Sequence, residues 1–99
     1  MSETRVIGRL YNQQIPDRAI QDVLSYLTEK GYYNVNTAPD NGALLVKFAR
    51  DGRIESVVNE LVPKIEQLGY DTWHDLELQG FNGSDAVSRY TRGRIIRDY

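Results

Sequence analysis

The sequence predicts an α+β domain in which a four-stranded antiparallel sheet carries two helices on one of its faces. Three observations support this prediction. The apolar pattern repeats at an offset of 38 residues without a gap, so that Val6 aligns with Leu44 and Leu27 aligns with Ile65. Each copy of the pattern has the periodicity of a strand, an amphipathic helix and a second strand. The length of 99 residues suits one domain with its own core.

The first copy begins with a predicted strand at residues 5–11, which is short and contains β-branched residues. A helix is predicted over 16–30, because Pro16 suits the first helical position and Gly31 can adopt the left-handed conformation that ends a helix. A closing strand is predicted at 33–37. The apolar stripe of this helix has the spacing i, i+3, i+4, i+7 and consists of Ile20, Val23, Leu24 and Leu27.

The second copy predicts a strand at 43–49, a helix at 53–68 and a strand at 74–79. Residues 39–42, Pro-Asp-Asn-Gly, are typical of a turn between the two copies. Pro63 lies inside the second helix and removes one backbone hydrogen bond, so we expect a kink or a split there. The buried stripe of this helix is predicted to be Ile54, Val57, Val58, Leu61, Ile65 and Leu68.

Two such units in tandem have the order strand, helix, strand, strand, helix, strand, which is that of the ferredoxin-like sandwich. The predicted ferredoxin-like domain covers residues 1–80, and residues 81–99 form an arginine-rich C-terminal extension. Within the extension we expect a short helix over 84–92, because Ser84-Asp85 resembles a helix cap and Gly93 would end the helix. An extended segment is expected at 94–97.

Composition excludes several kinds of chemistry. The chain has no cysteine and one histidine, which excludes disulfides, thiolate metal sites and cysteine nucleophiles. We therefore expect no metal, no cofactor and no catalytic residues. The sequence contains no apolar run near the roughly 20 residues of a membrane span, and its first residues lack the apolar stretch of a signal peptide. An intracellular, cytoplasmic protein that does not contact membranes is expected.

Charge is unevenly distributed along the chain, although the net charge is only −2. Residues 1–83 contain eight Lys and Arg against twelve Asp and Glu, whereas residues 84–99 contain four arginines against two aspartates. This asymmetry is compatible with a contact with nucleic acid or with an acidic partner. A basic tail that docks on its own acidic body, or a solvated terminal helix, would give the same pattern.

Alternation along the strands predicts an uncovered sheet face. If Val6 and Leu10 point to the helices, their neighbours point to the other face, and nothing in residues 1–80 is left to cover it. Arginine and the seven tyrosines of the chain are residue types that recognition surfaces prefer. The uncovered face of the two central strands is predicted to carry Ile7, Arg9, Tyr11, Ala43, Leu45 and Lys47.

Segments 4–10 and 41–48 resemble the two signature strands of the RNA recognition motif, and the resemblance extends over residues 4–62. It implies RNA binding by stacking of bases on aromatic side chains of these strands. In this chain the signature positions of the second segment hold Ala43 and Leu45.

Two further resemblances are partial. Arg18 at the start of the first helix and Asn36 at the end of the second strand resemble the residues that acylphosphatases use, which implies hydrolysis of an acyl phosphate. Residues 15–31 followed by a strand resemble the ACT domains, which implies an amino-acid sensor at a subunit interface.

We predict a small non-enzymatic binding or regulatory protein that acts by protein–protein contact, such as an inhibitor or adaptor of a larger assembly, and that forms a homodimer. The alternative is an RNA- or DNA-binding protein that uses the uncovered face and the arginine tail. An acylphosphatase-like hydrolase and an ACT-like sensor are lesser alternatives. The predicted partner-binding residues are Ile7, Arg9, Tyr11, Leu45, Lys47, Arg89, Tyr90, Arg92, Arg94, Ile95, Ile96 and Arg97.

Overall fold

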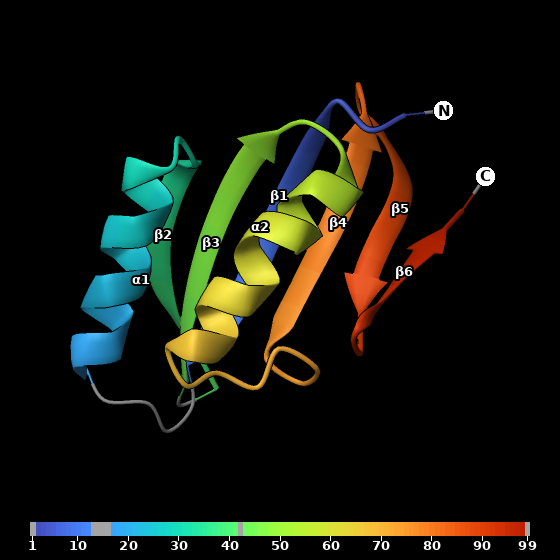
Figure 1. Ribbon diagram of the computed structural model, residues 1–99. Coiled ribbons are helices and arrows are strands. Elements are labelled where there is room, and N and C mark those ends of the chain that lie inside the picture. The colour runs from blue at the N-terminus through green and yellow to red at the C-terminus, as the bar shows by residue number, and fades with distance from the viewer. Residues whose placement is uncertain (1, 13–16, 42, 99) are drawn as a thin grey trace.

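A computed structural model describes residues 2–12, 17–41 and 43–98 of the chain, apart from the side chains of 17–19. Both helices pack against one face of a single sheet (Figure 1). The elements in chain order are β1 (Arg5–Asn12), α1 (Asp17–Glu29), β2 (Tyr33–Asp40), β3 (Ala43–Asp51), α2 (Ile54–Gln67), β4 (Leu76–Asn82), β5 (Asp85–Thr91) and β6 (Arg94–Arg97).

The sheet has six strands in the order β2-β3-β1-β4-β5-β6, and every neighbouring pair is antiparallel. It curls into a half-barrel, with the two helices on one side and the opposite side free of helices (Figure 1). β1 lies in the interior between β3 and β4, so its alternating side chains supply the middle of both faces.

The predicted fold class, a four-stranded ferredoxin-like sandwich, is wrong. The sheet has two further strands, β5 and β6, which pair successively onto β4. The expected helix over 84–92 is the strand β5, in which Ser88 and Tyr90 are buried and Arg89 between them is exposed. That alternation has the period of a strand. The segment 94–97, expected to be extended, is confirmed as β6.

Turn chemistry explains why the helix signals at 84–92 were misleading. Asp85 does not cap a helix, because it begins β5 opposite Asn82 at the end of β4. Arg92 and Gly93 have φ values of 51° and 77°, which are those of the two central residues of a type I′ hairpin turn. Gly93 therefore turns the chain from β5 into β6.

The other predicted elements are found at or near their expected positions. α2 runs without interruption through Pro63, so the helix is not split there. The last predicted strand, 74–79, instead begins at Leu76, because residues 71–75 form a turn. Pro16 and Gly42, predicted to start a helix and to complete a turn, lie outside the described residues.

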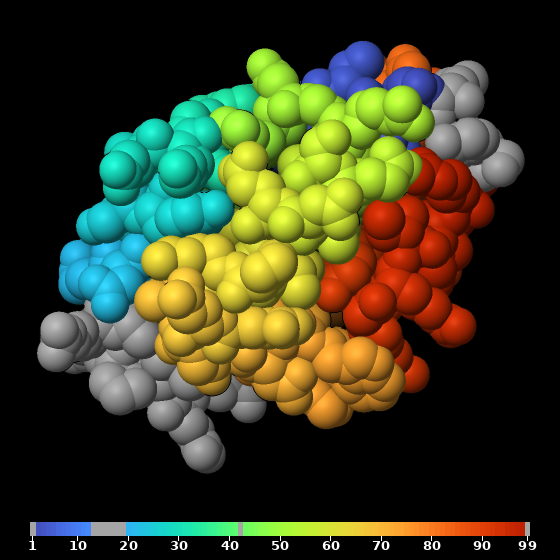
Figure 2. Space-filling view, viewed as in Figure 1, coloured from blue at the N-terminus to red at the C-terminus, as the bar shows by residue number. Residues whose placement is uncertain are grey.

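The core lies between the helices and the sheet. α2 lies between α1 and the β5–β6 hairpin (Figure 2). Gly8 marks the closest approach inside the sheet, because a Cβ atom there would lie 2.2 Å from the ring of Phe48. The largest fully buried side chains are Leu10, Leu27, Ile54, Leu61, Ile65 and Leu76.

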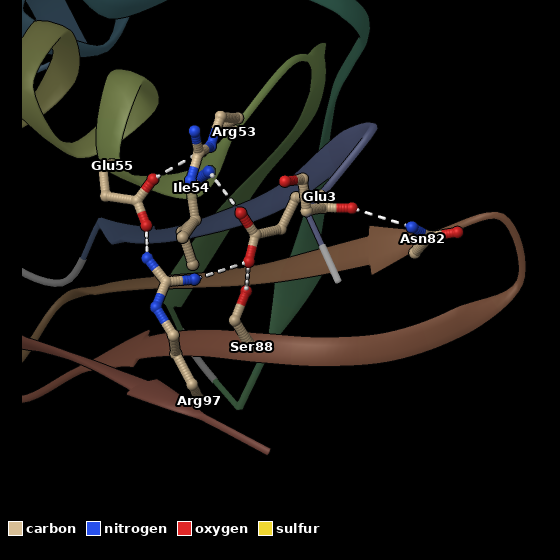
Figure 3. Close-up of polar contacts among 8 residues, drawn as sticks. Glu3, Arg53, Ile54, Glu55, Asn82, Ser88 and Arg97 are labelled. Atoms are coloured by element: carbon tan, nitrogen blue, oxygen red, sulfur yellow. Dashed lines mark hydrogen bonds and ion pairs between the residues drawn. The ribbon is translucent and has the colours of Figure 1, made fainter. Parts of the chain in front are cut away.

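The buried carboxylate of Glu3 connects the segment before β1 to α2, β5 and β6 (Figure 3). Oε2 of Glu3 accepts hydrogen bonds from Ser88 Oγ at 2.7 Å and Arg97 Nη1 at 2.8 Å, and Oε1 accepts one from the Ile54 N–H at 3.3 Å. Arg97 also forms an ion pair with Glu55. Although burial favours the neutral acid, these hydrogen bonds and the charge of Arg97 lower the pKa of Glu3.

Candidate binding face

We call the side of the sheet away from the helices the open face. Its members follow from the register: Arg9 lies opposite Lys47 of β3 and Glu77 of β4, and Gln79 of β4 lies opposite Arg89 of β5. Side chains two residues away along each strand share this face. The open face carries Arg5, Ile7, Arg9, Tyr11, Leu45, Lys47, Glu77, Gln79, Phe81, Arg89, Arg94 and Ile96.

A groove of about 420 Å³ runs over β1, β4 and β5 on this face. Its walls supply cations from two strands, Arg9 and Arg89, with Glu77 on the strand between them. Ile7 adds an apolar surface that is 36% exposed. The groove is lined by Ile7, Arg9, Glu77, Leu78, Gln79, Phe81, Arg89, Tyr90 and Thr91.

The cations of the open face have no ionic partners within the described part of the chain. Arg9 stands directly opposite Lys47 across β1 and β3, and like charges in that position destabilise a sheet. Among the described residues, no ion pair involves Arg9, Lys47 or Arg89. These cations lie on a chain whose net charge is −2, and Glu77 of β4 is the carboxylate that lies opposite Arg9.

Phe81 borders the same groove and is half-buried. The guanidinium of Arg5 lies 5.4 Å from the centroid of the Phe81 ring, a cation–π contact that partly covers the ring. On β2 and β3, the Tyr33 hydroxyl donates a hydrogen bond to Asp51 Oδ1 at 2.6 Å. That bond raises the pKa of Tyr33.

The structure divides the predicted partner-binding residues between the two faces of the sheet. Eight of the twelve are placed on the open face, although one of them, Leu45, is only 7% exposed. Arg92 lies at the turn between β5 and β6. The remaining three point to the helix side, where Tyr90 is 4% exposed, Ile95 packs against the core and Arg97 binds Glu3. The eight are Ile7, Arg9, Tyr11, Leu45, Lys47, Arg89, Arg94 and Ile96.

Two kinds of residue were missed in the sequence. Glu77, Gln79 and Phe81 line the groove, and their alternation along one strand was the available signal. Trp73 is 49% exposed in the turn before β4. It is the single tryptophan of the chain and lies in a polar segment, where an exposed indole is unusual.

The described part of the structure does not bring together the residues that resemble acylphosphatases and ACT domains. The side chain of Arg18 and the start of segment 15–31 lie outside the described residues. Asn36 uses its amide nitrogen to donate a hydrogen bond to the Asn34 carbonyl at 3.0 Å. Across the described residues, no group of three or more His, Asp or Glu side chains could hold a metal ion.

Comparison with protein-family models, curated proteins and solved structures gives no match for this chain. Of the two helices that the structure describes, neither is long and apolar enough to cross a membrane. The site must therefore be interpreted from its own geometry.

Proposed function

We propose that this chain is a non-enzymatic binding protein whose open face holds single-stranded nucleic acid. The observation that carries the proposal is a set of cations without ion pairs on three strands of one face, Lys47, Arg9 and Arg89, of which Arg9 and Arg89 line the groove. Phosphates can serve as the anionic partners that these side chains do not have within the described part of the chain, and phosphate contacts dominate nucleic-acid affinity.

The spacing of the cations suits a polymer better than a small anion. Lys47 on β3 and Arg89 on β5 are separated by three inter-strand steps, a distance of about 14 Å at roughly 4.8 Å per step. Arg9 lies between them. A chain of phosphates crossing the strands could reach all three cations, which a single phosphate could not.

The groove also offers groups that suit bases. Glu77 can accept a hydrogen bond from an exocyclic amino group, and the amide of Gln79 can both donate and accept. Ile7 and the exposed part of Phe81 supply apolar surface for a base. The nucleic-acid function, named from the sequence as the alternative, therefore has both phosphate-binding and base-binding groups on one face.

Contact with an acidic protein is the second candidate, and the exposed Ile7 beside Arg9 and Arg89 favours it. In that role the chain would regulate or inhibit a larger assembly. Self-association has less support, because Ile95 packs against the chain's own core. A face-to-face dimer would also set Arg9 and Lys47 against like charges of the second copy. A cytoplasmic location, expected from the sequence, is compatible with either partner.

Binding of a fluorescent oligothymidine of about 12 nucleotides, followed by anisotropy, tests the proposal. We expect Arg9→Ala, Lys47→Ala and Arg89→Ala each to weaken binding and to lower the slope of log affinity against log salt by about 0.7. Arg53→Ala is the matched control, because Arg53 is exposed beside α2, away from the open face (Figure 3). It should bind as the wild type does.

Two results would contradict the proposal. One is the absence of oligonucleotide binding at low salt. The other is binding that the three open-face substitutions leave unchanged. Retention of polyglutamate in place of the oligonucleotide would assign the face to an acidic protein.

A further inference from the structure

We infer that Trp73 is a stacking site for one base of the bound strand, with Arg92 placed to hold an adjoining phosphate. The inference rests on the proposed function for the identity of the polymer, but it uses residues outside the groove. Trp73 is 49% exposed and Ile7 is 36% exposed, and these are the two exposed large apolar side chains of the described residues.

The backbone beneath Trp73 is fixed by the side chain of Asp71. Oδ1 of Asp71 accepts hydrogen bonds from the N–H of Trp73 at 3.0 Å and from the N–H of His74 at 3.3 Å. Oδ2 of Asp71 lies 2.5 Å from Nδ1 of His74. Thr72 is held as well, because its hydroxyl donates a hydrogen bond to Glu66 Oε1 at 2.8 Å. These hydrogen bonds therefore hold the backbone of the turn that carries the Trp73 indole.

The indole ring is itself restrained by its neighbours. The His74 ring lies edge-on at a centroid distance of 4.5 Å, and the Arg92 guanidinium lies 5.9 Å from the Trp73 ring centroid. Gly93 approaches so closely that a Cβ atom there would lie 2.9 Å from Trp73 Cδ1. The hairpin turn and the loop before β4 meet at this corner (Figure 2). An indole that is restrained and half exposed loses little freedom when a ligand stacks on it.

The position of the corner connects it to the open face. Thr91 lines the groove, and the next residue along the chain is Arg92, whose guanidinium lies over Trp73. Arg89 and Arg94, both on the open face, lie on the same hairpin. A strand that crosses the groove can thus pass these arginines on its way to the indole.

The combination of a flat apolar ring and an adjacent guanidinium selects the ligand. A nucleobase with its phosphate presents a flat π surface beside a negative charge, which matches Trp73 and Arg92. Stacking on an aromatic side chain tolerates any base, so we expect the corner to add affinity without strong sequence preference.

Because Trp73 is the only tryptophan, its fluorescence reports on this corner alone. The full chain is titrated with three probes: oligothymidine, an abasic deoxyribose-phosphate oligomer of the same length, and thymidine monophosphate. We expect quenching by oligothymidine, weaker quenching by the monophosphate at higher concentration, and none by the abasic oligomer. Quenching by the monophosphate alone would assign the corner to free nucleotides and overturn its role in strand binding.

Variants separate stacking from folding. Trp73→Ala should lower oligothymidine affinity about tenfold and leave affinity for the abasic oligomer unchanged, whereas Trp73→Phe should retain most of the affinity. Arg92→Ala should weaken both oligomers, with Arg53→Ala as its control.

The outcomes distinguish this inference from the proposed function. Oligothymidine that binds without changing Trp73 emission, or binds Trp73→Ala at wild-type strength, overturns the stacking site and leaves the open face standing. If no oligonucleotide and no nucleotide changes the emission or binds, both fail. Quenching by polyglutamate would also overturn the stacking site.

Discussion

The two faces of the sheet use arginine in opposite ways. On the helix side, Arg97 binds the buried carboxylate of Glu3 at 2.8 Å, and Arg50 lies 3.3 Å from a carboxylate oxygen of Glu60. On the open face, Arg9 lies opposite Lys47 with no ion pair within the described part of the chain. The helix-side arginines are paired with carboxylates. We expect the like charge opposite Arg9 to lower stability, and we propose that the open-face arginines bind a ligand.

The largest effect should come from removing the carboxylate of the helix side. Glu3→Ala leaves Ser88, the Ile54 N–H and part of the Arg97 guanidinium without their acceptor. We expect a loss of about 3 kcal/mol in the free energy of unfolding, measured by urea denaturation. Glu3→Gln retains the shape and should lose less. A loss below about 0.5 kcal/mol for Glu3→Ala would show that the cluster does not hold the hairpin.

Gly8→Ala should also destabilise the helix side, by roughly 2 kcal/mol. A Cβ atom at position 8 would lie 2.2 Å from the ring of Phe48 and 2.9 Å from Leu78. Replacing the Phe48 ring by the smaller leucine side chain should make room for the added methyl group. Gly8→Ala should therefore cost less stability in the Phe48→Leu background than in the wild type. If Gly8→Ala costs the same stability in both backgrounds, the contact with Phe48 is not the cause of the loss.

Acid should remove the contribution of Glu3. The pKa of Glu3 in the folded chain lies below the ordinary glutamate value of 4.5, so its stabilisation is present above pH 4.5 and is lost as pH falls through the folded pKa. We expect the stability difference between wild type and Glu3→Gln to shrink between pH 7 and pH 3 in urea denaturation. A difference that grows on acidification has the wrong sign for this cluster.

The smallest change in stability should come from the open face. Lys47→Ala removes the like charge opposite Arg9, so the free energy of unfolding should stay within about 0.5 kcal/mol of wild type or rise. The same variant should lose oligonucleotide affinity. A clear loss of stability would mean that Lys47 belongs to the fold, and the contrast between the two faces would then fail.

The first four strands and both helices were predictable because each has a clear apolar period. Strand β5 was not, because Ser84-Asp85 and Gly93 resemble the start and stop of a helix. Its alternation of buried and exposed residues results from pairing with β4, which is a tertiary contact. Local signals favoured a helix there, and the available edge of β4 favoured a strand.

Part of the candidate site followed from alternation alone. Ile7, Arg9 and Lys47 were placed on one uncovered face from their parity in two strands. The addition of Arg89 depends on the register across β4 and β5, which shifts between Gly80 and Phe81. Such a shift changes which side chains share a face, and no pattern in the sequence marks it.

Backbone resonances of the ¹⁵N-labelled chain, followed during titration with oligothymidine, test the central claim most directly, because they report which face the ligand covers. We predict that the largest shift changes fall on Arg9, Lys47, Gln79 and Arg89, with Trp73 at the end of the path. The exposed surfaces of α1 and α2 should change little. Shift changes concentrated on the helices, or none at saturating oligonucleotide, would contradict the account.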